Sequence, residues 1–381
     1  CMAPVPSTLT SARLAAAVGV SMLALAACSA DAVITDTTPS PSVPGTSPTA
    51  PAPSATASAD DFDPFPDRPA PTVEPWPDHG DFLVDVTKAV VPAVTLAQEE
   101  RWDDYDLMNR IVHTAQFRWI GSWSTNDAIA NYAHQVYVAA AEADRIGLIA
   151  YYGMRDYTCE EAAGDPALEA FYQERSQVLV EELPGSGADV WILLEPGLIA
   201  DLGSCENDPR GAWLSDAAAT LAGAGAAVYL DAGLVEDPDR LAATLAGLDL
   251  APVAGIAVGT NGYRAPSDQV AGGQAVLAAL AAAGVDIDAP RTGSDPGQAG
   301  LGIIVDTSRS GVPLDDPDPC NPPEAGIGVP PRLIGDGTLD AHVWIKRVGE
   351  SDGACNGGPT RGQFSRNHAL ALAANGSLEE H

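Results

Sequence analysis

Short apolar runs alternate with longer Ala/Leu-rich segments from about residue 81 to the end of the chain. The apolar runs show no polar alternation, which is typical of strands buried on both faces, and the segments between them have helical spacing. This order predicts an α/β fold, with a parallel sheet and helical crossovers. The predicted strands are Ile146–Tyr152, Val190–Glu195, Ala227–Asp231, Gly255–Gly259, Gly302–Asp306 and His342–Lys346, and the predicted helices are Ile129–Arg145, Leu168–Glu182, Asp216–Ala224, Pro238–Leu245 and Ser267–Ala283.

Several predicted strands end in a polar residue, and the carboxyl ends of parallel strands meet at one edge of a sheet. Carboxylates gathered at that edge suit acid–base chemistry on a glycosidic bond, or the binding of a hard metal ion. The alternative is that each acid caps the helix that follows it. The residues concerned are Glu195, Asp231, Asp306 and Lys346, with Glu350 and Asp352 just beyond.

The composition narrows the possible partners. The chain has 381 residues, with 52 acidic and 19 basic side chains and a formal net charge of -33. A nucleic-acid-binding protein needs a basic surface, and anionic lipid also attracts basic residues, so both are excluded as electrostatic partners. A neutral polysaccharide is compatible with this charge, and so is a role in solubility alone. We expect a monomer.

The N-terminal region predicts export. In residues 1–28, Arg13 precedes the apolar run Leu14–Ala27, which is too short for a stable membrane span. The run ends in Leu-Ala-Ala-Cys, which is similar to a lipobox and predicts lipidation of Cys28; the alternative is an ordinary signal peptide. Cys1, ahead of Met2, fits neither interpretation.

The rest of the chain then divides into three parts. Residues 29–77 are rich in Pro, Ser, Thr and Ala and predict a disordered tether. Residues 78–375 form the predicted folded domain, and residues 376–381 resemble a cloning scar. This order predicts an extracellular lipoprotein on the cell surface, touching the membrane through its lipid anchor alone.

A series of motifs resembles glycoside hydrolase family 6, the cellulases and cellobiohydrolases that cut β-1,4-glucan with inversion. The resemblance runs from roughly residue 82 to residue 374 and implies a distorted parallel β/α barrel. The motifs are Phe82–Asp85, Trp119–Trp123, Arg155-Asp156, Val228–Gly233, Asp306–Gly311, Cys320–Pro323 and Asp340–Pro359.

The resemblance implies roles for individual residues. Asp352 matches the proposed catalytic base, Lys346 and Glu350 match residues that hold sugar hydroxyls, and Trp119 matches a tryptophan that stacks on glucose. Asp156 matches the aspartate that tunes the pKa of the acid, although two extra residues separate it from the next cysteine.

Two further candidates come from the neighbouring strands. Asp231 lies in a matching strand and joins the catalytic candidates. The tyrosine that distorts the sugar corresponds to Tyr151 or Tyr152, and we take Tyr152 as the substrate-binding candidate.

The departures from the family all concern the acid or the substrate. The general-acid aspartate should follow Glu195-Pro196, where this chain has Gly197. Asp201 could replace it if the loop bends; the alternative is an acid on a helix surface. Other family side chains are lost at Leu234, Gly259, Gly262 and Pro319.

The remaining cysteines predict disulfides. Four cysteines follow the signal, in an export context where disulfides persist, and the residues alone allow three pairings. The family resemblance implies the pairs Cys159–Cys205 and Cys320–Cys355. Metal ligation is the alternative, but no CxxC or paired histidines support it, and we expect no metal and no cofactor.

Three functions remain open. The first is a surface-anchored hydrolase of β-1,4-glucan whose activity is impaired by Gly197. The second is an inactive carbohydrate-binding or cell-envelope lipoprotein, and the third is an engineered variant that lacks the acid.

Overall fold

The computed structural model describes residues 68–154, 157–290, 300–315 and 320–380. The chain divides into two units, and the described helices and strands all belong to the second, Phe65–His381. The lipobox at Cys28, the tether, Asp156 and Pro319 lie outside the described residues, so the inferences about them stay predictions. Within the described ranges, no helix is long and apolar enough to cross a membrane.

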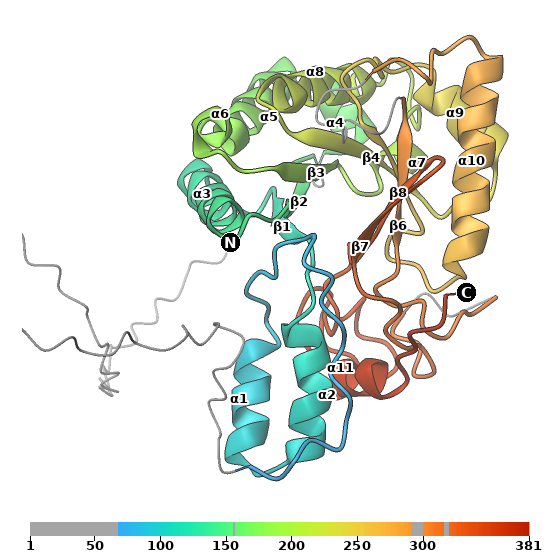
Figure 1. Ribbon diagram of the computed structural model, residues 1–381. Helices are drawn as coiled ribbons and strands as arrows, with labels where there is room; N and C mark the ends of the chain where they lie inside the picture. The colour runs from blue at the N-terminus through green and yellow to red at the C-terminus, as the bar shows by residue number, and fades with distance from the viewer. Residues whose placement is uncertain (1–67, 155–156, 291–299, 316–319, 381) are drawn as a thin grey trace, which may run out of the picture. The chain divides into compact units, whose positions relative to one another are not determined.

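One eight-stranded sheet organises the fold, in the order β1-β2-β3-β4-β5-β6-β8-β7. All neighbouring pairs are parallel except β7 and β8, which pair antiparallel at one edge. The sheet curls into a half-barrel, which confirms the predicted distorted parallel β/α barrel (Figure 1). The strands are β1 Arg118–Gly121, β2 Gly147–Tyr152, β3 Val190–Leu194, β4 Ala227–Gly233, β5 Gly255–Val258, β6 Gly302–Asp306, β7 Arg332–Asp336 and β8 Leu339–Val343.

Helices follow most strands, and the five predicted ones correspond to α3, α5, α8, α9 and α10. Helices α1, α2 and α11 pack together as a separate group beside the sheet (Figure 1). The bounds are α1 Val90–Gln98, α2 Trp102–Val112, α3 Asn126–Ala143, α4 Cys159–Gly164, α5 Pro166–Val180, α6 Leu183–Ser186, α7 Leu198–Asp201, α8 Arg210–Gly223, α9 Pro238–Leu245, α10 Pro266–Ala282 and α11 Arg366–Ala374.

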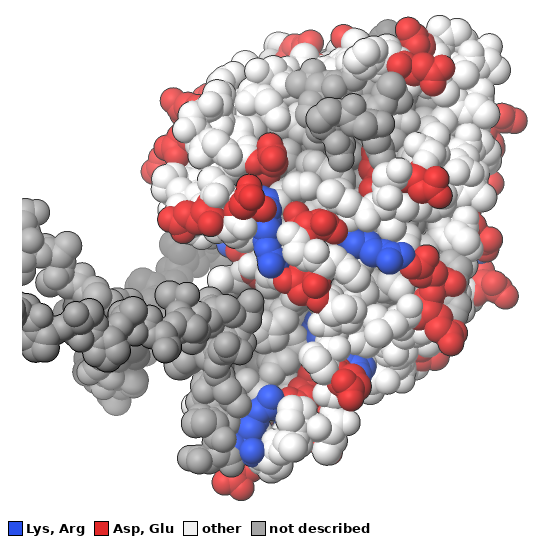
Figure 2. All heavy atoms as spheres, in the orientation of Figure 1, with Lys and Arg blue, Asp and Glu red and all other residues white. Residues whose placement is uncertain are grey.

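Side chains of the strands alternate between two buried layers, as the period of a strand requires. Leu148, Ala150 and Trp191 point inside the curled sheet, whereas Ile149 and Tyr151 pack outward against the helices. Because both layers are apolar, the strands read as continuous hydrophobic runs. The surface carries the charge: acidic side chains are spread over the visible face, and basic ones are few (Figure 2).

One motif forms no named strand, and one predicted strand is shifted. Phe82–Asp85 forms only an isolated bridge, between Phe82 and Ile146. Strand β8 lies earlier than predicted, because the carboxylate of Asp306 accepts hydrogen bonds from the backbone N–H groups of Ile345 and Lys346, at 3.1 and 3.2 Å. A side chain therefore holds the segment after β8 at the carboxyl edge of the sheet.

Candidate active site

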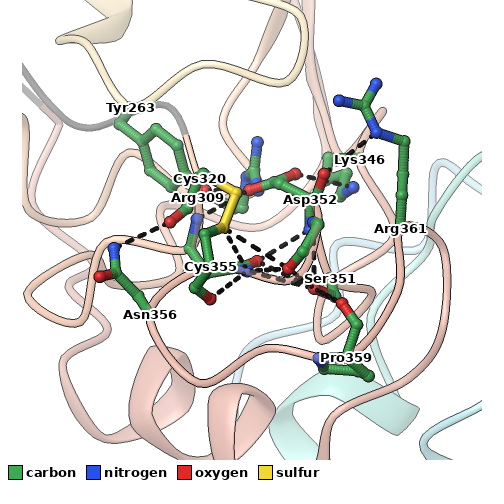
Figure 3. Close-up of a disulfide and its surroundings, with 12 residues drawn as sticks. Tyr263, Arg309, Cys320, Lys346, Ser351, Asp352, Cys355, Asn356, Pro359 and Arg361 are labelled. Atoms are coloured by element: carbon green, nitrogen blue, oxygen red, sulfur yellow. Dashed lines mark hydrogen bonds and ion pairs between the residues drawn. A yellow bond between two sulfur atoms is a disulfide. The ribbon is translucent and has the colours of Figure 1, made fainter.

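Asp352 is the centre of a dense polar cluster beyond the end of β8 (Figure 3). Its Oδ1 lies 3.0 Å from Nζ of Lys346. Its Oδ2 accepts hydrogen bonds from the Tyr263 hydroxyl at 2.6 Å, the Arg309 guanidinium at 2.7 Å and the Asn321 backbone N–H at 3.2 Å. The carboxylate is thus held by two cations and two neutral donors.

These partners keep Asp352 ionised. Burial opposes ionisation, but the charges of Arg309 and Lys346 outweigh it and hold the pKa of Asp352 well below its usual range. Burial in turn lowers the pKa of Lys346, with a smaller contribution from the positive charge of Arg309. The carboxylate can orient a water molecule by accepting a hydrogen bond from it, but the low pKa weakens Asp352 as a base.

Asn321 and a disulfide fix the backbone of Asp352. The Asn321 side chain accepts from the Asp352 N–H at 2.8 Å and donates to the Gly353 carbonyl at 2.9 Å. The bond between Cys320 and Cys355 joins the same two loops, and it was predicted correctly (Figure 3). The second predicted bond, Cys159–Cys205, is also confirmed and links the segments that follow β2 and β3.

Glu350, the other sugar-binding candidate beside Lys346, is turned towards the α1 side of the molecule. Its carboxylate lies 2.8 Å from Nζ of Lys88 and 4.0 Å from Nε of Arg347. The side chain is mostly buried in this ion-paired arrangement.

Gly197 begins α7 in a left-handed conformation, with φ of 88°. Its N–H donates to Oδ2 of Asp231 at 2.6 Å, and the other oxygen of Asp231 accepts from Gly233 at 3.0 Å. Asp231 is buried, and this burial raises the pKa of its carboxyl group. A Cβ atom added at Gly197 would meet nothing within 4 Å, so the position faces open space.

The acid that follows β3 and the acid that ends β6 accept hydrogen bonds from backbone N–H groups. Glu195 accepts from the N–H groups of Gly153 and Met154, at 2.8 and 3.1 Å, and Asp306 accepts from the turn at Asn261 as well as from the segment after β8. Both carboxylates are buried. Their contacts favour the interpretation that these strand-end acids hold loops in place.

Asp201 is engaged elsewhere. Its Oδ2 accepts a hydrogen bond at 2.7 Å from Arg210, a buried guanidinium that also binds Asp208 at 2.8 Å. This pairing favours the interpretation of Asp201 as a helix-surface acid, because a replacement acid would need to carry a proton towards the substrate.

The aromatic candidates lie together at the ends of β1 and β2. Trp119 and Tyr152 meet edge to face, with ring centroids 5.8 Å apart, and the indole N–H of Trp119 donates to the Ile345 carbonyl at 2.9 Å. Tyr151 points the other way, is fully buried and stacks on Tyr172. Of the two tyrosines, Tyr152 is therefore the one beside Trp119.

Arg309 and Asn321 lie within motifs found from the sequence and Tyr263 lies outside them, and the sequence assigned none of the three a role. The signal that could have found Arg309 is a cation in the turn directly after a buried strand. No group of three or more His, Cys, Asp or Glu side chains that could hold a metal ion is found among the described residues.

Comparisons with known proteins agree with the fold and the motifs. Residues 81–376 match the family model described as "Glycosyl hydrolases family 6". Endoglucanase A of Cellulomonas fimi is 32% identical over 280 residues, which are 71% of this chain and 57% of that protein. Endoglucanase 1 of Streptomyces halstedii is 32% identical over 266 residues, 67% of this chain and 76% of that protein. The chain therefore spans a little over half of the first of these relatives.

Solved structures match over a longer stretch. The endoglucanase Cel6 from Mycobacterium tuberculosis, solved with a thio-cellobioside ligand, superposes with a TM-score of 0.62 at 24% identity, over 77% of this chain and 97% of that one. Endoglucanase CEL6B from Humicola insolens gives a TM-score of 0.62 at 18% identity, over 78% and 97%. At these identities the superpositions show the fold alone, whereas the family model and the two endoglucanase relatives show the family. This chain belongs to glycosyl hydrolases family 6.

Proposed function

We propose that this protein acts on β-1,4-glucan by the inverting chemistry of its family, with Asp352 on the side of the attacking water and with activity impaired by Gly197. The observation that carries the proposal is the contrast between two positions. Asp352 keeps a full set of partners, namely Lys346, Arg309 and Tyr263. Gly197 keeps its backbone contact to Asp231 but carries no side chain.

Inverting hydrolysis needs two carboxyl groups, one that protonates the leaving oxygen and one that activates water. In this proposal the ionised Asp352 carboxylate orients the attacking water as a hydrogen-bond acceptor, and its low pKa makes it a weak base. Nothing at Gly197 can donate a proton, and loss of general-acid help typically costs about 10²–10⁴-fold in rate. Asp156 would tune the missing acid, as the family resemblance implies.

A carbohydrate-binding protein without activity is the second candidate. The observation that favours it is the half-buried pair of Trp119 and Tyr152, which offers an aromatic surface for a sugar ring while the acid is absent. In this case Lys346 and Glu350 would bind hydroxyl groups, and Asp352 would serve as a hydrogen-bond acceptor.

The cellular setting is part of the proposal. Residues 1–28 would direct export, lipid attached to Cys28 would hold the protein at the cell surface, and the monomeric domain would bind glucan without nucleic acid or cofactor. The two disulfides support an oxidising compartment. Cys28→Ala should release the protein from the membrane fraction, and an unchanged distribution would contradict the anchor.

The test of activity compares four proteins on one soluble β-1,4-glucan: native, Asp352→Ala, Asp201→Asn and Gly197→Asp. Reducing-sugar release and calorimetric binding of cello-oligosaccharides are both measured. We expect weak activity in the native protein, less in Asp352→Ala, no change in Asp201→Asn and a gain in Gly197→Asp.

Each alternative has its own signature in the same experiment. Strong native activity that survives Asp352→Ala would refute the assigned site. Loss of activity in Asp201→Asn would identify Asp201 as the replacement acid. Binding without activity in any variant would favour the carbohydrate-binding protein.

A further inference from the structure

Trp123 is an exposed tryptophan at the carboxyl end of β1, and the chemistry assigned above does not use it. More than half of its side-chain surface, 55%, is open to solvent. Among the exposed large hydrophobic side chains of the described residues it is the only tryptophan. Single exposed apolar side chains are common on protein surfaces, and what sets this indole apart is its place in a turn beside the candidate site.

The indole rests on a glycine. A Cβ atom added at Gly121 would fall 2.5 Å from Cη2 and 2.9 Å from Cε3 of Trp123, so only glycine leaves room for the ring there. The indole also meets the ring of Tyr152 edge to face, with centroids 6.3 Å apart. One side of the ring thus packs against the backbone of Gly121, and the rest is exposed to solvent.

The turn beneath Trp123 is rigid. The N–H of Ser122 donates to the Tyr152 carbonyl at 3.0 Å, and the N–H of Ser124 donates to the Gly121 carbonyl at 2.9 Å. From α5, the buried guanidinium of Arg175 donates to the carbonyls of Gly121 and Ser124, at 3.1 and 2.6 Å.

Burying that cation is costly unless its hydrogen bonds are made, so the turn is well determined before any ligand arrives. A ligand that stacks on Trp123 would then lose little free energy in ordering the protein.

Trp123 continues the aromatic surface of the candidate site. Tyr152 touches both tryptophans, with Trp119 on one side at 5.8 Å and Trp123 on the other at 6.3 Å. A β-linked glucan presents alternating pyranose faces whose C–H groups are apolar, and such faces pack on exposed aromatic rings. We propose that Trp123 is a sugar-stacking subsite that extends the candidate site beyond Trp119 and binds one further pyranose ring of a β-1,4-linked oligosaccharide. This inference rests on the proposed function.

The test measures binding of cello-oligosaccharides of increasing length, from the trimer to the hexamer, by calorimetry with the full chain. Trp123→Ala should weaken binding of the hexamer by about 2- to 12-fold, the range expected for one aromatic contact. Binding of the shortest oligosaccharide that the native protein holds should stay unchanged. Trp123→Phe should keep part of the affinity.

Gly121→Ala tests the packing of the Trp123 ring on Gly121 without removing the indole. Its new Cβ would push the Trp123 ring from its position, so it should reproduce the length-dependent loss. Tyr132→Ala is the matched control: Tyr132 is an exposed aromatic on α3 that contacts Arg118, at the amino end of β1, and its removal should change binding at no length. Thermal unfolding of each variant checks that the fold is kept.

The outcomes separate the two proposals. A loss in Trp123→Ala that is equal at all lengths, or no loss, would overturn the subsite and leave the proposed function standing. Failure of the native protein to bind any of the oligosaccharides would overturn both.

Discussion

Restoring a carboxyl group at Gly197 is the sharpest test of the interpretation that the catalytic acid is absent. The substitution Gly197→Asp adds a side chain where no atom lies within 4 Å of the new Cβ, so it creates no clash. Its cost comes from the backbone, because φ is 88° there and L-residues pay about 1–2 kcal/mol in the left-handed region, with Asp among the more tolerant. The contact from its N–H to Asp231 is a backbone contact and should survive.

The neighbourhood of Gly197 favours a protonated acid. Asp231 lies directly beneath it, and a second carboxylate so close would raise the pKa of the new aspartate by like-charge repulsion. A raised pKa is what a general acid needs near neutral pH. With Asp352 and a water aligned, the gain in hydrolysis of an unactivated glucan should approach the lower part of the range of about 10²–10⁴-fold.

The assay is initial-rate release of reducing sugar from soluble β-1,4-glucan, run beside a cello-oligosaccharide that carries an acidic phenol. The native protein should do relatively better on the phenol substrate, because that leaving group needs little protonation. Gly197→Asn is the matched control, since it has nearly the same size and backbone strain but no acidic proton to transfer to the leaving oxygen. Equal rates in Gly197→Asp and Gly197→Asn would refute the reasoning.

Three further predictions follow from other contacts. Burial raises the pKa of Glu195 from 4.5 to about 7, so the stability that its protonated form contributes is fully present below pH 4.5 and is lost as the pH rises to 7. The free energy of unfolding should fall by about 3 kcal/mol over this range. Glu195→Gln should remove this fall, measured by chemical denaturation at both ends of the range. Replacing Cys320 and Cys355 by serine should lower the unfolding free energy by about 3–4 kcal/mol in the chain-entropy model, measured by urea denaturation, and an unchanged midpoint would contradict it. Arg309→Gln should raise the pKa of Asp352 towards its ordinary value, because it removes the nearer charge that lowers it; carboxyl NMR titration checks the direction.

The strands of this fold were predictable because they are buried on both faces. Each of β2 to β6 contains an apolar run rich in β-branched or aromatic residues, whereas the apolar runs of α8 and α10 consist mainly of alanine and leucine. Strand β7 was missed since it is a half-exposed edge strand with a mixed pattern, and edge strands carry little periodic signal. Helix α2 was missed because its first turn is dominated by acidic residues and its buried positions include Asp106.

Only those parts of the candidate site that lie within a family motif were predictable from the sequence. The loop that carries Lys346 and Asp352 was found from its resemblance to a family. The donors that complete the Asp352 cluster come from positions 89, 43 and 31 residues away in the chain, so only the folded sheet brings Tyr263, Arg309 and Asn321 to one carboxylate. The acids at the strand ends could not be sorted from sequence either, because loop bracing and catalysis use the same residue types at the same edge.

The altered residues and the cations of the Asp352 cluster lie on different parts of the carboxyl edge. Arg309 and Lys346 follow β6 and β8, whereas Gly197, Leu234 and Gly262 follow β3, β4 and β5. Tyr263 is the exception, because it follows Gly262 in the turn after β5 and contacts Asp352 from there. Leu234 lies over Gly262, where a Cβ would fall 2.5 Å from its Cδ2 and 2.9 Å from the Gly259 carbonyl, so a larger side chain at Gly262 needs both the leucine and the turn to move.

This arrangement constrains what Gly197→Asp can recover. An added acid acts in the transition state and should raise kcat and kcat/KM together. The apolar contact between Leu234 and Gly262 offers the substrate no polar partner in either state, and the added acid leaves it unchanged, so KM should change little. A fall in KM without a rise in kcat would mean that the new carboxylate binds sugar rather than protonating it.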